Sequence, residues 1–145
     1  MSQGFLKGKT ALVTGSTSGI GLGIAQSLAR QGARIVVNGF GDVDGARRAI
    51  ESLGVQTLYH GADMSKVDQI EDMMAHIAQQ WGAVDILVNN AAFVGTDGLK
   101  GWTTPVEEQS IDTWRSALEV NLTTPFLLAQ QSIPALKASG KGVVI

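Results

Sequence analysis

Short apolar runs alternate with segments of helical spacing along the chain. The runs are brief, as is usual for strands buried on both faces of a sheet, and they cover residues 10–14, 34–38, 55–59, 84–88 and 142–145. Between the first two runs, Ile20, Ile24 and Leu28 recur every four residues, which is typical of an amphipathic helix. The pattern predicts five strands connected by crossover helices.

Capping and turn residues delimit the other expected helices. The second helix covers residues 44–53 and the third covers residues 65–81. Ser65 is the expected N-cap of the third helix, and Gly82 is its stop signal. A longer helix is expected over residues 110–139, and its apolar residues are not confined to one side.

This alternation predicts an α/β fold, in which right-handed crossovers place helices on both faces of a parallel sheet. A chain of 145 residues, 44% of them hydrophobic, suits one domain over residues 1–145 with a genuine core. The long loop over residues 92–109 contains Trp102, which is either a packing residue or a cover over a substrate.

Composition and charge argue against some classes of binding partner. The formal net charge is −2 and the longest basic run is the pair Arg47 and Arg48, which is too little to attract nucleic acid. No apolar stretch is long enough to span a bilayer, and residues 1–8 lack a signal-peptide core. The chain has no cysteine. We expect a cytoplasmic protein that has no nucleic-acid or membrane partner and no metal site.

A glycine-rich loop follows the first strand. Gly15, Gly19 and Gly21 suit a tight turn, a close approach of backbone to a pyrophosphate, and close packing of helix against strand. The free N–H groups at the start of the first helix then favour an anion. The alternative is a flexible connection only. The strand before and the helix after favour a dinucleotide site, formed by Thr14, Gly15, Ser16, Ser18, Gly19, Ile20 and Gly21.

The spacing of Thr14 and the three glycines resembles the fingerprint of the short-chain dehydrogenase/reductase family. Three further matches occur in order: Asp63 after the third strand, the run 89–91 (Asn-Asn-Ala) after the fourth, and Asn121 in the long helix. Taken singly, each has another interpretation, as a residue before an N-cap, a turn, or a surface amide. Ala92 stands where the family has glycine, and its methyl group puts cofactor affinity in doubt.

The resemblance implies a Rossmann-type, doubly wound parallel sheet with strand order 3-2-1-4-5, here ending before strands 6 and 7. It implies hydride transfer between NAD(P) and an alcohol or ketone. The cofactor-binding residues that it adds are Asp63, Met64, Asn89, Asn90 and Ala91, and the active-site residue is Asn121. Residues 1–90 are most similar to bacterial 3-hydroxybutyrate dehydrogenases, which makes a 3-hydroxy acid one possible substrate, whereas residues 102–109 resemble a different branch.

Charge near the expected site favours NAD over NADP. A 2′-phosphate needs a basic residue in the glycine loop or after the second strand. No Lys or Arg lies between Lys9 and Arg30, and none lies in residues 38–45. Asp42 is a candidate acceptor for the ribose hydroxyl, or alternatively a turn residue beside Gly41.

The catalytic groups that the resemblance implies are a tyrosine, a lysine four residues later and a serine, all following the fifth strand, where this chain ends. The only tyrosine, Tyr59, lies in the third strand, and we expect it in the core or on the sheet surface. His60 and His76 are expected to lie too far apart for a catalytic pair. The chain is therefore predicted to bind cofactor without turnover by itself.

Two other hypotheses remain open: activity within a longer protein, and a non-catalytic nucleotide-binding or self-associating module. The helix at 110–139 and the strand ending at Ile145 would each expose apolar surface. We expect a homo-oligomer formed through one or both of these surfaces.

Overall fold

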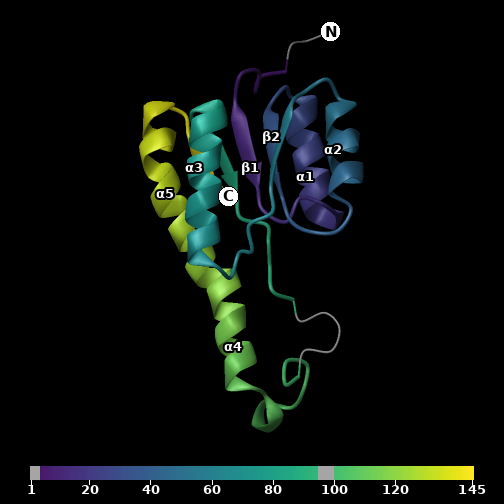
Figure 1. Ribbon diagram of the computed structural model, residues 1–145, viewed down its shortest axis with the longest axis vertical. Helices are drawn as coiled ribbons and strands as arrows, with labels where there is room; N and C mark the ends of the chain where they lie inside the picture. Colours follow the sequence, from purple (N-terminus) through teal and green to yellow (C-terminus); the bar gives the residue numbers. More distant parts are fainter. Residues whose placement is uncertain (1–3, 95–99) are drawn as a thin grey trace.

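Five parallel strands form the sheet of the computed structural model, which describes residues 4–94 and 100–145 (Figure 1). The strand order is β3-β2-β1-β4-β5, which confirms the predicted order and fold class. The strands are β1 (Thr10–Val13), β2 (Arg34–Asn38), β3 (Thr57–His60), β4 (Ile86–Val88) and β5 (Val143–Val144). Within the described residues, no helix has the length and apolar character needed to cross a membrane.

Helices cover both faces of the sheet. Helices α1 (Gly19–Arg30) and α2 (Val43–Glu51) lie on one face, and α3 (Val67–Trp81) and α5 (Thr124–Ala138) lie on the other (Figure 1). Two apolar clusters result, because alternate strand residues face opposite sides. In β1, Ala11 and Val13 pack in the cluster under α1 and α2, whereas Leu12 packs under α3 and α5.

Helix α1 meets the sheet through small residues. Gly21, Ala25 and Ala29 are buried at four-residue spacing, which lets the helix backbone approach the strands. Ile20 was expected on the core face with Ile24, but its side chain is 79% exposed. The buried residues of α1 each lie one position after a large apolar residue, because only small side chains fit where the helix packs closely against the sheet.

Two predictions about helices need correction. Ser65 is not the N-cap of the third helix, which begins at Val67 after Lys66; the Ser65 hydroxyl instead donates to Asp63 Oδ1 at 2.8 Å. The segment expected as one helix over residues 110–139 is helical from Ile111 to Ala138, but it is divided. Helix α4 (Ile111–Leu118) and α5 are joined by a π-helical turn, Glu119–Thr123, a local widening that is frequent at functional sites.

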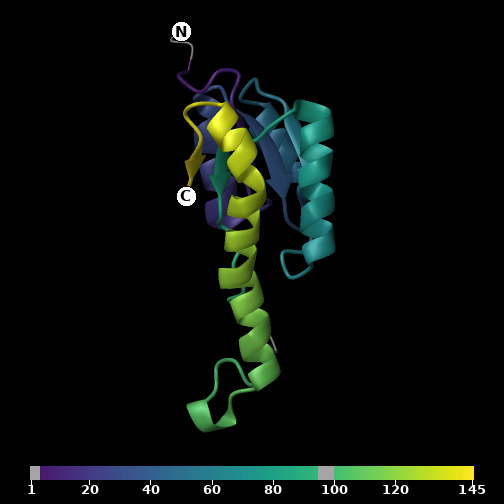
Figure 2. The ribbon, with the colours of Figure 1, turned by 90° about the vertical axis from the view of Figure 1, so that its left-hand side faces the viewer.

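Helix α4 extends well beyond the carboxyl edge of the sheet and forms an arm with residues 100–110 (Figure 2). Its start is capped by Ser110, whose hydroxyl accepts from Thr113 N. The short 3₁₀ helix Val106–Glu108 lies at the end of the arm. The rest of the loop expected over residues 92–109 is only partly described, because residues 95–99 lie outside the described ranges.

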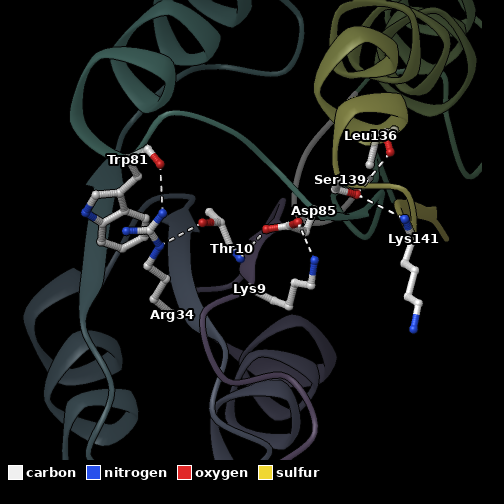
Figure 3. A network of polar contacts seen from close by, with 8 residues as sticks. All are labelled: Lys9, Thr10, Arg34, Trp81, Asp85, Leu136, Ser139 and Lys141. Carbon is white, nitrogen blue, oxygen red and sulfur yellow. Dashed lines mark hydrogen bonds and ion pairs between the residues drawn. The ribbon is translucent and has the colours of Figure 1, made fainter.

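A polar network joins the elements at the amino edge of the sheet (Figure 3). The Asp85 carboxylate accepts from Lys9 Nζ at 3.0 Å and from the backbone N–H of Thr10 at 2.9 Å. Arg34 donates to Thr10 Oγ1 and to the Trp81 carbonyl, both at 2.7 Å, and its guanidinium lies 4.8 Å from the centroid of the Trp81 ring. The polar side chains at this edge are thus engaged with one another.

Candidate functional site

A cleft of about 600 Å³ lies at the opposite, carboxyl edge of the sheet. In open α/β sheets this edge is where ligands bind. The cleft is lined by Gly15, Thr17, Ser18, Gly19, Ile20, Gly21, Asn38, Gly39, Phe40, Ala62, Asp63, Met64, Asn90, Ala91, Ala92, Phe93, Val94 and Val120. Among these lining residues, Asp63 is the only charged one.

The glycine loop forms the floor of the cleft. Gly15 and Gly19 have φ of 64° and 53°, a conformation that strains any other residue. A Cβ on Gly21 would lie 2.1 Å from the Gly15 carbonyl oxygen, so the close packing there requires glycine. A Cβ on Gly19 would meet no protein atom within 4 Å, so the space beside it is open.

The first turn of α1 is electropositive. The N–H groups of Gly19, Ile20 and Gly21 have no acceptor within the helix, because a helix leaves its first amides unpaired. Ser18 precedes them as N-cap, but its side chain makes no capping hydrogen bond. These amides and the helix dipole make the start of α1 a site for an anion.

Asn38, the last residue of β2, holds the glycine loop in place. Its side chain accepts from Gly15 N at 3.3 Å and donates to the carbonyls of His60 and Ala62 at 3.1 and 2.9 Å. Its backbone carbonyl accepts from Ser16 N at 2.7 Å. Because Asn38 is only 1% exposed, these bonds are sheltered from water. Sequence reasoning missed this role.

Thr14 and Asn90 hold the other side of the loop. The Thr14 hydroxyl accepts from the backbone N–H groups of Asn90 and Ala91 at 3.1 and 2.9 Å. The Asn90 amide donates to the carbonyls of Thr14 and Gly15 at 3.0 and 3.2 Å. The loop after β1 is therefore fixed against both neighbouring strands, β2 and β4.

Most of the expected cofactor-binding residues come together at the cleft, and four do not line it. Thr14 and Ser16 are buried beneath the loop. Asp42 is the N-cap of α2, where its carboxylate accepts from Gly45 N at 2.9 Å. Asn89 donates from its backbone N–H to the Ile145 carbonyl at 2.8 Å. The lining residues among the expected set are Gly15, Ser18, Gly19, Ile20, Gly21, Asp63, Met64, Asn90 and Ala91.

Asn121 lies in the π-helical turn and clamps the loop after β4. Its Oδ1 accepts from Phe93 N at 2.7 Å, and its Nδ2 donates to the Phe93 carbonyl at 3.1 Å. Both halves of the amide are thus engaged with one residue of the cleft wall. Asn121 thus contacts the loop after β4 from within the π-helical turn.

Tyr59 and the two histidines lie away from the cleft lining. The Tyr59 hydroxyl donates to the Gly39 carbonyl at 3.0 Å, and its ring packs against the apolar cluster under α1 and α2, in agreement with a core position. The expectation that His60 and His76 are far apart is wrong: their ring centroids are 5.6 Å apart, and His60 Nε2 lies 3.1 Å from Asp72 Oδ2. The end of β3 and the facing side of α3 bring them together.

The fold is a doubly wound α/β fold with a glycine loop beside the cleft, and comparison gives the family. The family model for short chain dehydrogenases matches residues 9–145, so the chain belongs to the short-chain dehydrogenase family. It is 46% identical to a D-beta-hydroxybutyrate dehydrogenase of Cupriavidus necator over 142 residues, and 43% identical to one of Rhizobium meliloti over 141. These alignments cover 97% and 94% of this chain, so the similarity continues past residue 90.

A solved structure has the same fold. The L-sorbose reductase of Gluconobacter frateurii, complexed with NADPH and L-sorbose, superposes with a TM-score of 0.86 at 30% identity. The match covers 99% of this chain and 53% of that protein. The chain spans about half the length of the relatives it matches, since it covers 52% of each of the two hydroxybutyrate dehydrogenases.

Replacing Asn38 should destabilise the fold. Asn38→Ala removes the partners of a loop amide and of two carbonyls in a buried setting, so we expect the free energy of unfolding to fall by about 1–3 kcal/mol in urea titrations. Asn89→Ala is the matched control, because the Asn89 side chain donates only one long hydrogen bond, at 3.4 Å, to the Ile145 carbonyl. Equal losses for the two variants would contradict the central role of Asn38.

Proposed function

We propose that this chain binds NAD, with the diphosphate at the first turn of α1, and supplies the cofactor-binding part of a site for hydride transfer with an alcohol or ketone. The observation that carries the proposal is the uncapped start of α1, which opens onto the cleft where Gly19 leaves space for a ligand. Membership of the short-chain dehydrogenase family supports it. The proposal includes a cytoplasmic location, which the absence of cysteine fits.

The loop position sets the orientation of the dinucleotide. In this fold the ribose next to adenine lies beyond the second strand, so the adenosine half extends toward Phe40 and Asp63. The nicotinamide half then extends the other way, along Asn90, Ala91 and Ala92 after β4. When bound, NAD accepts or donates the hydride at its nicotinamide ring.

The described residues bind and orient in this proposal, and none of them is assigned the proton transfer. Tyr59 donates its hydroxyl to Gly39 O and does not line the cleft. Asn121 acts by fixing Phe93 beside the nicotinamide end of the cleft. We therefore expect this chain by itself to bind the cofactor without turning over 3-hydroxybutyrate or simple ketones. Similarity to two hydroxybutyrate dehydrogenases makes a 3-hydroxy acid one candidate substrate for a complete site.

The choice of NAD over NADP rests on charge. A 2′-phosphate is bound by an arginine or lysine near the second strand, and none of the cleft-lining residues that the structure describes is basic. The candidate ribose acceptor Asp42 is engaged as the cap of α2. Phe40, 64% exposed, lines the cleft just beyond β2 and places an apolar side chain where a 2′-phosphate would need a basic one.

The proposal includes association with a second copy through the outer faces of α4, α5 and β5. Large apolar side chains are exposed along these elements: Ile111, Trp114, Leu118, Leu122, Phe126, Ile133, Val143, Val144 and Ile145. In the described sheet, β5 is an edge strand that pairs only with β4. An apolar surface joined to an open strand edge is a usual site of self-association.

Gly19→Ala should weaken cofactor binding. The added methyl group strains a positive-φ position and enters the open space at the start of α1, so we expect the dissociation constant for NADH to rise on the order of tenfold, measured by NADH fluorescence. Gly54→Ala introduces the same strain, with φ of 85° and open surroundings, but lies outside the cleft lining. Unchanged NADH affinity in a folded Gly19→Ala variant would refute the proposed diphosphate site.

Phe40→Arg should change cofactor preference. A guanidinium at this position would pair with the 2′-phosphate, so the affinity for NADPH relative to NADH should rise by about tenfold in the same assay. Phe5→Arg adds the same charge at a residue that does not line the cleft and should leave the ratio unchanged. If wild-type protein binds NADPH more tightly than NADH, the choice of NAD is wrong.

Light scattering after size-exclusion chromatography tests the association. We expect the wild-type chain to elute with at least twice its monomer mass, and Phe126→Lys to shift the population toward monomer, because it places a charge in the apolar surface. Phe5→Lys, at a residue that is also exposed but lies near the amino edge, is the control. A wild-type monomer at high concentration would contradict self-association.

A further inference from the structure

Phe93 forms an ordered apolar wall at the nicotinamide end of the cleft. Its backbone is held on both sides by the Asn121 amide, at 2.7 and 3.1 Å. Its ring meets the ring of Trp102 edge to face, with centroids 5.4 Å apart and an interplanar angle of 86°. Phe93 lines the cleft, whereas Trp102 packs against it from the arm. Such edge-to-face pairs are favourable beyond the area they bury.

Trp102 is itself anchored to the start of α4. The adjacent Gly101 is buried with φ of 72°, and its carbonyl accepts from Ser110 N at 2.9 Å. A Cβ on Gly101 would lie 2.5 Å from that nitrogen, so the close approach depends on glycine. On the other side, Thr113 Oγ1 donates to the Lys100 carbonyl at 3.0 Å. The arm therefore holds Trp102 in a defined position behind Phe93.

Two amide side chains that the structure describes near this wall already have hydrogen-bond partners. The Asn90 amide donates to the glycine loop, and the Asn121 amide is occupied by Phe93. The remaining lining residues after β4 are apolar: Ala91, Ala92, Phe93 and Val94, with Val120 opposite. The one charged residue among the described lining residues, Asp63, follows β3 and is acidic. Since none of the described lining residues is basic, a carboxylate placed against them would lose water without gaining a cationic partner from them.

We propose that Phe93 is a substrate-contacting residue that selects an uncharged carbonyl compound or alcohol, with an aryl or alkyl group packed on its ring. Trp102 is the positioning residue that fixes the ring. This inference rests on the proposed function, because it needs the nicotinamide end of the cofactor beside Phe93. Between the two substrate chemistries left open, it favours a neutral ketone over a 3-oxo acid.

Saturation-transfer NMR on the intact chain tests this directly. The sample contains NAD⁺, which forms a non-reacting complex with a ketone, together with either acetophenone or acetoacetate. We expect saturation transfer to acetophenone in the presence of NAD⁺ and little to acetoacetate. The NAD⁺ resonances in the same spectra report cofactor binding independently of the ketone.

Variants assign the contact to the two rings. Phe93→Ala should raise the dissociation constant for acetophenone by about tenfold while leaving that for NAD⁺ unchanged. Trp102→Ala should give a smaller increase, and Trp102→Phe should restore the wild-type value, because it keeps an aromatic edge against Phe93. Phe5→Ala is the control for Phe93→Ala, since Phe5 is an exposed aromatic residue outside the cleft lining.

The outcomes separate the two proposals. Absence of NAD⁺ binding to the wild type would refute the proposed function. NAD⁺ binding without acetophenone binding, or with equal binding of acetoacetate, would overturn only the inference about Phe93. A Phe93→Leu variant guards against misfolding: if it retains NAD⁺ affinity and binds acetophenone as well as the wild type does, the ring is not the contact.

Discussion

The proposed cofactor site depends on a short stretch of unpaired backbone N–H groups at the start of α1, held in one position at the carboxyl edge of the sheet. Such groups bind an anion well only when the loop before them is rigid, because an ordering cost would otherwise offset the attraction. Rigidity comes from two buried or half-buried asparagines on either side. Asn38 ties the glycine loop to β2 and β3, and Asn90 ties it to β4.

The two edges of the sheet have different roles. At the amino edge, Lys9 pairs with Asp85, and Arg34 donates to the Thr10 hydroxyl and the Trp81 carbonyl, which stabilises the packing of strands and α3. At the carboxyl edge, polar side chains hold loops and leave backbone amides turned toward the cleft. Phe93 is held in the same way, by Asn121 from the π-helical turn and by Trp102 from the arm. The surface of the cleft is thus formed mainly by backbone and apolar groups, and the polar side chains hold these groups in position.

The fold was predictable because its signals are local. Apolar runs, glycine positions and helical spacing each depend on a few neighbouring residues, and they yielded the strands and the loop; the strand order followed from the family resemblance. The features that the sequence did not predict depend on contacts between residues that lie far apart in the chain. The role of Asn38 requires knowing that Gly15 and Ala62 lie beside it, and the meeting of His60 with His76 requires the packing of α3 on β3. The helical spacing predicted that Ile20 is buried, but it is exposed, because close packing of α1 against the sheet buries the small residues Gly21 and Ala25 instead.

In the proposed function, the backbone amides at the start of α1 bind the diphosphate of the cofactor. The most direct measurement is a ¹⁵N–¹H correlation spectrum of the labelled chain during titration with NAD⁺. If these amides bind the diphosphate, the largest amide shifts will fall on Ser18, Gly19, Ile20 and Gly21, with smaller ones at Asp63 and Ala91. Saturable binding that leaves the amides of residues 18–21 unmoved and shifts those of another region would contradict it.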